Sequence, residues 1–288
     1  MLDRETIDRI RRIRIRTRTI LESGIVGAYH TVFKGRGMEF AEVREYEPGD
    51  DVRTIDWNVT ARMNAAYVKK FVEERDLNLM LVVDISGSQS FGSRYVIKRD
   101  LAAELAAVLA FSAVANHDRV AAVLFSDRIE AYIPPGRGND HALRIVRDLL
   151  ALEPAGRGTD LAGALRLANR VMKRRGIATV ISDFQAPDYQ RALGMLRRRH
   201  DVVAIYLSDP HENEVPPAGL MALSDSETED LWIVDTSDPS VRRRLRTAVL
   251  EHARETCRRT RVDLLPLSTV ESYEKPLSGF FRARERRR

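Results

Sequence analysis

The sequence predicts an α/β fold in which a mostly parallel β-sheet lies between layers of helices. The first observation is the apolar run Leu79–Val83, which contains no polar residue and is typical of a strand buried on both faces. The second is the alternation of such runs with amphipathic stretches, which favours parallel strands joined by crossover helices. The third is a group of polar residues directly after the first run, because open α/β sheets bind ligands where their strands end.

Residues 1–22 are predicted to form a basic amphipathic helix. Arginines crowd this segment, and its isoleucines fall on one helical face: Ile7, Ile10, Ile13 and Ile20. Such a helix can lie on a membrane surface or on a partner. We expect instead that its apolar stripe packs on the chain's own domain, and peripheral contact with a membrane remains the alternative.

Residues 23–76 predict a small β-rich subdomain, because glycines punctuate short segments here. The sequence Glu47–Asp50 has Pro and Gly at its centre, which is the chemistry of a type II turn. This segment also contains three aspartates, Asp50, Asp51 and Asp56. They could form a second metal cluster, but carboxylates beside arginines are more often a salt-bridged structural corner. We expect Trp57 to be the buried anchor of that corner.

Residues 77–270 are predicted to form the main α/β domain. The expected strands are 79–83, 120–125, 129–133, 177–182, 202–207, 231–234 and 262–267, and the expected helices are 96–115, 139–152, 160–175 and 239–260. Prolines and an acidic turn interrupt the alternation at residues 209–230, where we expect a hairpin. Residues 271–288 are expected to be a basic C-terminal tail, of which Phe280 and Phe281 dock on the body.

Five polar residues fall at the ends of predicted strands or on the adjacent loops. Asp84 follows the first apolar run, and Ser86 and Ser88 come next at alternate positions. Thr159 lies in a glycine-rich turn before a helix, and Asp183 ends another apolar strand. The carboxylate and hydroxyl oxygens of these residues are the hard ligands that Mg²⁺ takes in proteins, and Mn²⁺ and Ca²⁺ are alternatives. The simpler interpretation is that the two serines cap the next helix, which leaves the other residues unexplained.

The pattern Asp84-x-Ser86-x-Ser88, with Thr159 and Asp183, resembles the metal-ion-dependent adhesion site (MIDAS) of a von Willebrand factor A domain. All five positions carry that family's residue types. The resemblance implies a von Willebrand factor A-like, Rossmann-like fold and a metal ion held by these residues. It also implies that the ion keeps an open position and grips an Asp or Glu of a protein partner.

The flanking sequence narrows the resemblance. The stretch Tyr46–Trp57, followed by Ala61-Arg62 and Phe71–Arg75, is similar to the bacterial DUF58 family, and the similarity runs from about Gly27 to the last residues. Members of that family carry an A-type domain behind a characteristic N-terminal segment and are associated with MoxR-type AAA+ ATPases. The resemblance therefore implies such an ATPase as the partner, in complex assembly or chaperone activity.

Two other function classes remain as alternatives. A metal-dependent hydrolase needs an activated water and usually a nearby base, but the six histidines are scattered and the sequence has neither a nucleophile elbow nor a Walker A loop. We therefore expect no enzyme. The net charge of +5 and the arginine-rich ends permit nucleic-acid binding, but no aromatic and basic residues interleave. We expect no specific nucleic acid as a partner.

The compartment is predicted from cysteine usage and hydropathy. The chain has one cysteine, Cys257, which excludes an intramolecular disulfide and fits a reducing compartment. The sequence contains no apolar run long enough for a transmembrane helix and begins without the apolar region of a signal peptide. We therefore expect a cytoplasmic location.

Overall fold

The computed structural model describes residues 4–20, 38–63, 65–73, 78–90, 97–156, 158–210, 217–224, 231–241 and 249–287. Its centre is a six-stranded sheet with the order β10-β7-β6-β3-β4-β5. The strands are β3 (Asn78–Asp84), β4 (Arg119–Phe125), β5 (Ile129–Gly136), β6 (Ile177–Ser182), β7 (Asp201–Ser208) and β10 (Asp263–Ser268). All neighbouring pairs are parallel except β4 and β5. The predicted mostly parallel sheet is confirmed.

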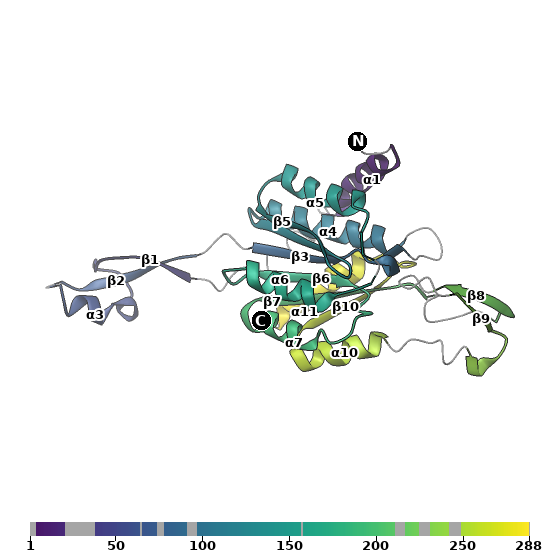
Figure 1. Cartoon of the computed structure of the whole chain (residues 1–288). Coiled ribbons are helices and arrows are strands. Elements are labelled where there is room, and N and C mark those ends of the chain that lie inside the picture. The colour runs from purple at the N-terminus through teal and green to yellow at the C-terminus, as the bar shows by residue number, and fades with distance from the viewer. Residues whose placement is uncertain are drawn as a thin grey trace.

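Two layers of helices cover this sheet (Figure 1). One layer contains α1 (Arg4–Ile20), α4 (Lys98–Ala115), α5 (Asn139–Ala151) and α11 (Glu274–Arg286), and the other contains α6 (Leu161–Val171), α7 (Gln190–Arg199) and α10 (Val249–Thr260). Side chains of β3 alternate between the two layers, with Leu79 and Leu81 in one core and Met80 and Val82 in the other. The uninterrupted apolar run is therefore needed because both faces of this strand are buried.

The N-terminal helix α1 packs on the body, as expected from its isoleucine stripe. Ile13 and Ile20 are buried in the same core as α4 and α5. Arginines on its polar side pair with acidic residues of α4, Arg9 with Asp100 and Arg16 with Glu104. The apolar stripe fixes the helix to the domain, and the ion pairs add to this contact.

The C-terminal residues also belong to the body, which differs from the expected tail. They form α11, whose Leu277 and Phe281 are buried in the core. Arg284 is buried as well and pairs with Asp201 at 2.7 Å and Asp263 at 2.8 Å. The three buried side chains lie on one helical face, at spacings of about one and two turns. The main domain therefore continues past residue 270.

The N-terminal subdomain is an antiparallel hairpin that Figure 1 draws apart from the sheet. It contains β1 (Met38–Glu45), η2 (Val52–Thr54), α3 (Trp57–Thr60) and β2 (Tyr67–Glu73). The predicted type II turn is present, because Gly49 has φ +115° and the Asp50 amide donates to the Glu47 carbonyl at 3.0 Å.

Two aspartates of this subdomain form ion pairs, as expected, although their partners are not Arg53 and Arg62, the arginines nearest to them in the sequence. Asp50 pairs with Arg44 at 2.6 Å, and Asp56 pairs with Lys69 at 3.2 Å. The prediction for Trp57 was wrong, because this side chain is 68% exposed. It lies in the first turn of the short helix α3, and a two-stranded hairpin has too little second surface to cover it.

The predicted hairpin after β7 consists of β8 (Leu220–Ser224) and β9 (Leu231–Asp235). Figure 1 shows it at the edge of the sheet where β3 and β7 end. Its acidic turn, residues 225–230, lies outside the described residues, as do residues 242–248 of the predicted helix 239–260. Across the described ranges, no helix combines the length and apolarity that crossing a membrane requires.

Candidate functional site

Asp84 is the centre of a buried polar cluster at the carboxyl edge of the sheet. It is the last residue of β3 and is fully buried. The Ser86 amide donates to its Oδ1 at 3.0 Å, and the Ser182 hydroxyl donates to its Oδ2 at 2.6 Å. Ser182 ends β6, which pairs with β3. Sequence reasoning missed Ser182, although its position directly before Asp183 at a strand end was a usable signal.

The two serines of the motif lie beside each other. Ser86 and Ser88 are buried, and their hydroxyl oxygens are 3.1 Å apart. Ser88 belongs to a short 3-10 helix, η3 (Gly87–Ser90). The next long helix, α4, has Ile97 at its N-cap and no side-chain cap there. The serines therefore do not cap α4, and their hydroxyls are gathered next to Asp84.

Asp183 has a buried lysine as its partner, which sequence reasoning missed. The Lys98 ammonium donates to Asp183 Oδ2 at 2.7 Å, and both side chains are almost fully buried. The Gln185 amide donates to the other carboxylate oxygen at 3.2 Å. Lys98 is the first residue of α4, where the positive end of the helix dipole disfavours a cation. A lysine at that position was a signal that an anionic partner lies nearby.

The cluster contains more negative than positive charge. Burial is the largest cause that raises the pKa of Asp84, and the nearby Asp183 carboxylate adds to it, giving a pKa of about 7. Two carboxylates face one ammonium in a buried cluster, so the ionised cluster lacks a compensating positive charge. This lack makes the site suitable for a cation.

The donor set fits a divalent metal ion in its chemistry. The ligands available are the carboxylates of Asp84 and Asp183 and the hydroxyls of Ser86 and Ser88, all oxygen atoms. Within the described ranges, no group of three or more His, Cys, Asp or Glu side chains is arranged to hold a metal. An ion at this edge of the sheet would therefore need the hydroxyls as ligands, and it would compete with Lys98 for Asp183.

Thr159 lies on the loop before α6, and hydrogen bonds to the backbone of Ser126 after β4 and to the side chain of Glu130 in β5 hold this loop in place. The Asp160 amide donates to the Ser126 carbonyl at 2.7 Å, and the Gly156 amide donates to Glu130 Oε1 at 2.9 Å. Ser126 directly follows β4, the neighbour of β3 in the sheet. These contacts place Thr159 at the same sheet edge as Asp84. Sequence reasoning missed Ser126 and Glu130.

We predict that Glu130→Ala weakens Mg²⁺ binding about tenfold, the low end of the effect for residues that orient metal ligands. The loss of the Glu130 carboxylate frees the Gly156 amide and lets the loop that carries Thr159 move. Isothermal titration calorimetry measures the affinity. Glu153→Ala removes an exposed carboxylate from the same loop and should bind as the wild type does. Equal affinities for wild type and Glu130→Ala would contradict a role for this loop.

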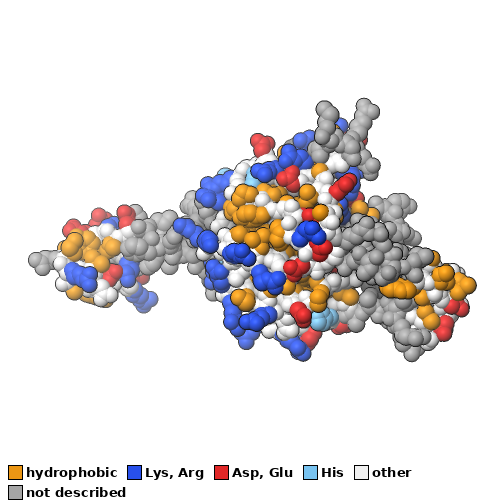
Figure 2. All heavy atoms as spheres, in the orientation of Figure 1, with side chains coloured by type: hydrophobic (Ala, Val, Ile, Leu, Met, Phe, Trp, Pro, Cys, Tyr) orange, Lys and Arg blue, Asp and Glu red, His pale blue; other side chains and the backbone are white. Residues whose placement is uncertain are grey.

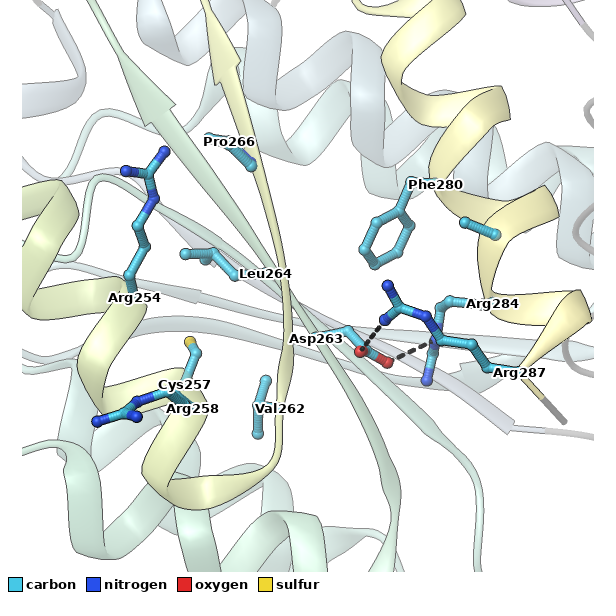
Figure 3. A pocket seen from close by; sticks show the side chains of 11 residues that line it. Arg254, Cys257, Arg258, Val262, Asp263, Leu264, Pro266, Phe280, Arg284 and Arg287 are labelled. Atoms are coloured by element: carbon cyan, nitrogen blue, oxygen red, sulfur yellow. Dashed lines mark ion pairs between the residues drawn. The ribbon is translucent and has the colours of Figure 1, made fainter.

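A hollow of about 410 Å³ lies at β10, between α10 and α11 (Figure 3). Figure 3 shows Val262 and Leu264 on the side of α10, and Phe280 and Arg284 on the side of α11. Asp263 points toward α11 and pairs with Arg284 at 2.8 Å. This arginine is used to fix α11 to the sheet, so we interpret the hollow as part of the packing of the C-terminal helix.

Comparisons with known proteins give the relatives and the fold. The family model "Protein of unknown function DUF58" matches residues 42–255. An uncharacterized protein of Mycobacterium tuberculosis is 32% identical over 283 residues, which cover 96% of this chain and 89% of that protein. An aerotolerance-related membrane protein from Bacteroides fragilis NCTC 9343 has a similar structure, with a TM-score of 0.51 and 15% identity over 72% of this chain and 99% of that chain. The SpRpn10 VWA domain has a TM-score of 0.41 and 12% identity over 72% and 94% of the two chains.

Proposed function

Because the chain belongs to the DUF58 family and has a von Willebrand factor A-like fold, we propose that it is a non-catalytic, metal-dependent protein-binding module. The metal ion is Mg²⁺, held at Asp84, Ser86, Ser88, Thr159 and Asp183. The observation that supports this most is the fully buried Asp84, whose pKa is raised to about 7 next to a second carboxylate. A cation at this place removes the cost of burying both charges.

The chemistry of the ligands explains why such a site would bind a protein carboxylate. A bound divalent ion supplies a strong local positive charge, which two carboxylates and neutral hydroxyls do not surround. Ser182 and the Ser86 amide orient the Asp84 carboxylate. Glu130 and Ser126 fix the loop of Thr159. These contacts hold the side chains at the carboxyl edge of the sheet, where the ion would meet an Asp or Glu of a partner.

Histidine chemistry gives no support to a hydrolase. Among the described residues, the histidine with a strongly perturbed pKa is His200, which is lowered to about 4 by burial first and then by Arg199 and Arg175. His200 lies directly before β7, at the amino edge of the sheet. It is therefore at the opposite edge from Asp84, whose strand runs parallel to β7. A binding module is the function that the site supports best.

The proposed partner is a MoxR-type AAA+ ATPase, and this proposal rests on the chain's membership in the DUF58 family. The proposed compartment is the cytoplasm. The ATPase would offer an exposed Asp or Glu to the metal ion. Complex assembly or chaperone activity by the pair follows from this proposal, with the present chain as the recognition subunit.

We predict that the protein binds a MoxR-type ATPase in the presence of Mg²⁺ and loses this binding in EDTA, as measured by biolayer interferometry on the immobilised ATPase. Ser88→Ala removes one hydroxyl ligand and should weaken binding in Mg²⁺ by roughly tenfold. Ser278→Ala on α11 makes the same chemical change away from the site and should have no effect. Binding that is equal in Mg²⁺ and in EDTA would rule out the metal as the link between the two proteins.

A further inference from the structure

A large hollow lies on the outer side of the sheet's second helix layer, between α7 and α10. Its volume is about 1190 Å³, and its lining comes from the length of α7 and from the end of α10. The lining residues are Asp188, Gln190, Arg191, Gly194, Met195, Arg197, Arg198, Arg259, Thr260 and Arg261. We propose that this hollow is a second, metal-independent docking surface that binds an acidic segment of a protein partner.

The charge of the lining supports an anionic occupant. Among the residues that the structure describes, the lining has five arginines and one carboxylate, that of Asp188. Two arginines have structural tasks: Arg197 Nε donates to the Arg261 carbonyl at 3.0 Å, and Arg259 pairs with Glu255 at 2.6 Å.

The other three arginines of the lining have exposed side chains: Arg191, Arg198 and Arg261. In the part of the chain that the structure describes, none of the three forms an ion pair with a carboxylate. Their guanidinium groups are therefore available to a ligand. Figure 2 shows that Lys and Arg predominate over Asp and Glu on the face that carries α6 and α7.

Local helix stability does not account for all of these arginines. Cations near the end of a helix interact favourably with its dipole, which explains Arg198 in the last turn of α7. Arg191 is in the first turn of the same helix, where no acidic residue is present and where the dipole disfavours a cation. This arginine thus has an unfavourable local environment, which a bound anion would correct.

Arg261 supports the same conclusion from the backbone. It directly follows α10 and has φ +57°, and the Val262 amide donates to the Cys257 carbonyl at 2.9 Å. This left-handed reversal after a helix favours glycine, because a Cβ atom is strained there. The chain has a long cationic side chain at a position that a glycine would fill with less strain, and that side chain lines the hollow.

The lining favours a protein segment over a nucleic acid. Guanidinium groups bind carboxylates and phosphates alike through paired hydrogen bonds, so the other residues of the lining decide between the two. Met195 is 46% exposed and offers an apolar contact between the arginines. Gly194 carries no side chain, and a Cβ atom placed there would be in ordinary van der Waals contact with the Thr260 methyl group, at 3.6 Å. The described residues of the lining include no aromatic side chain, whereas single-stranded nucleic acids are held by stacking on aromatic rings.

The surface is separate from the proposed metal site. The site at Asp84 is at the carboxyl edge of the sheet, whereas the hollow lies on the outer surfaces of α7 and α10, the helices that cover one face of that sheet. A partner can therefore bind here without a metal ion. The two surfaces would together give a partner with acidic groups two points of attachment, and their contributions can be measured independently.

The test is fluorescence anisotropy with a fluorescein-labelled oligoglutamate peptide in EDTA, which leaves the metal site out of the measurement. We expect the wild type to bind the probe and the variant Arg191→Gln/Arg198→Gln/Arg261→Gly to bind it roughly tenfold more weakly, from three exposed charge contacts of ordinary strength. Glycine at position 261 relieves the backbone, so this variant should remain folded, which a thermal melt checks.

The matched control removes the same number of arginines from the other side of the molecule, as Arg119→Gln/Arg144→Gln/Arg147→Gln on β4 and α5. It should bind the probe like the wild type. Equal weakening by both triple variants would mean general charge attraction and would overturn the proposal. A labelled oligothymidylate is the competing probe. If the wild type bound it more tightly than the peptide, and if only the hollow variant bound it more weakly than the wild type, the proposal would be overturned in favour of nucleic acid.

Discussion

Asp84→Ala is expected to abolish Mg²⁺ binding in a calorimetric titration in which the wild type binds the ion. Asp84 carries one of the two carboxylates of the proposed site and lies between Ser86 and Ser182, which hold it in place. Without it the ion would have one carboxylate, and the neutral hydroxyls cannot replace the missing charge. Binding of the ATPase partner should be lost together with the ion.

The controls separate the loss of the ion from a loss of folding. Asp84→Asn keeps the shape of the side chain and should also fail to bind Mg²⁺. Asp209→Asn makes the same change at another buried aspartate, which follows β7 at the same edge of the sheet, and it should bind Mg²⁺ normally. If both Asp84 variants bound Mg²⁺ as the wild type does, the ion would be held elsewhere in the protein.

The raised pKa of Asp84 adds a pH dependence to this prediction. Burial and the Asp183 carboxylate raise that pKa to about 7 in the metal-free protein, so protons compete with the ion below this pH. Mg²⁺ affinity should fall by up to about tenfold per pH unit below pH 7 and be constant above it. The folded-state pKa lies above the unfolded one, so the contribution of Asp84 to the stability of the metal-free protein is fully present below about pH 4 and is lost as pH rises from about 4 to 7. Asp84→Asn should lack this decrease in urea unfolding at a series of pH values.

Lys98→Met is expected to destabilise the metal-free protein and to strengthen its binding of Mg²⁺. Methionine fills a similar volume, but Asp183 then loses its buried cation. Removing one member of a buried ion pair costs about 3–5 kcal/mol, which urea unfolding in EDTA measures. In this variant Mg²⁺ no longer competes with the Lys98 ammonium for Asp183, and the ammonium no longer repels the ion. The affinity for Mg²⁺ should therefore increase about tenfold or more. Added Mg²⁺ should restore most of the lost stability.

Lys275→Met serves as the control for this variant. It changes an exposed lysine of α11, so neither stability nor Mg²⁺ affinity should change. If Lys98→Met were as stable as the wild type and bound the ion with the same affinity, Lys98 would have no part in the charge balance of the site. A loss of stability that Mg²⁺ does not repair would mean that the lysine supports the fold alone.

Errors of the sequence-based predictions came from elements that depend on what covers them. Residues 271–288 were expected to be a basic tail that only Phe280 and Phe281 attach to the body, because most of these residues are polar or charged, but the segment forms a helix that also buries Leu277 in the core. Trp57 was expected in a core because large aromatic residues are usually covered, yet it lies on a hairpin with no second layer over it. In both cases, the local sequence contains no information about the surface opposite.

The class of the fold could be predicted from the sequence alone, and so could the position of Asp84, Ser86 and Ser88 at the end of a buried strand. The apolar run of β3 has to be buried on both faces, and Asp84, Ser86 and Ser88 follow where that strand ends, because strand direction and side-chain alternation are local properties. Only the tertiary structure showed the partners of those residues. Lys98 reaches Asp183 and Ser182 reaches Asp84 across many positions of sequence. Such contacts depend on how strands and helices pack against one another, and a buried charge obtains its partner from whichever element the fold brings beside it.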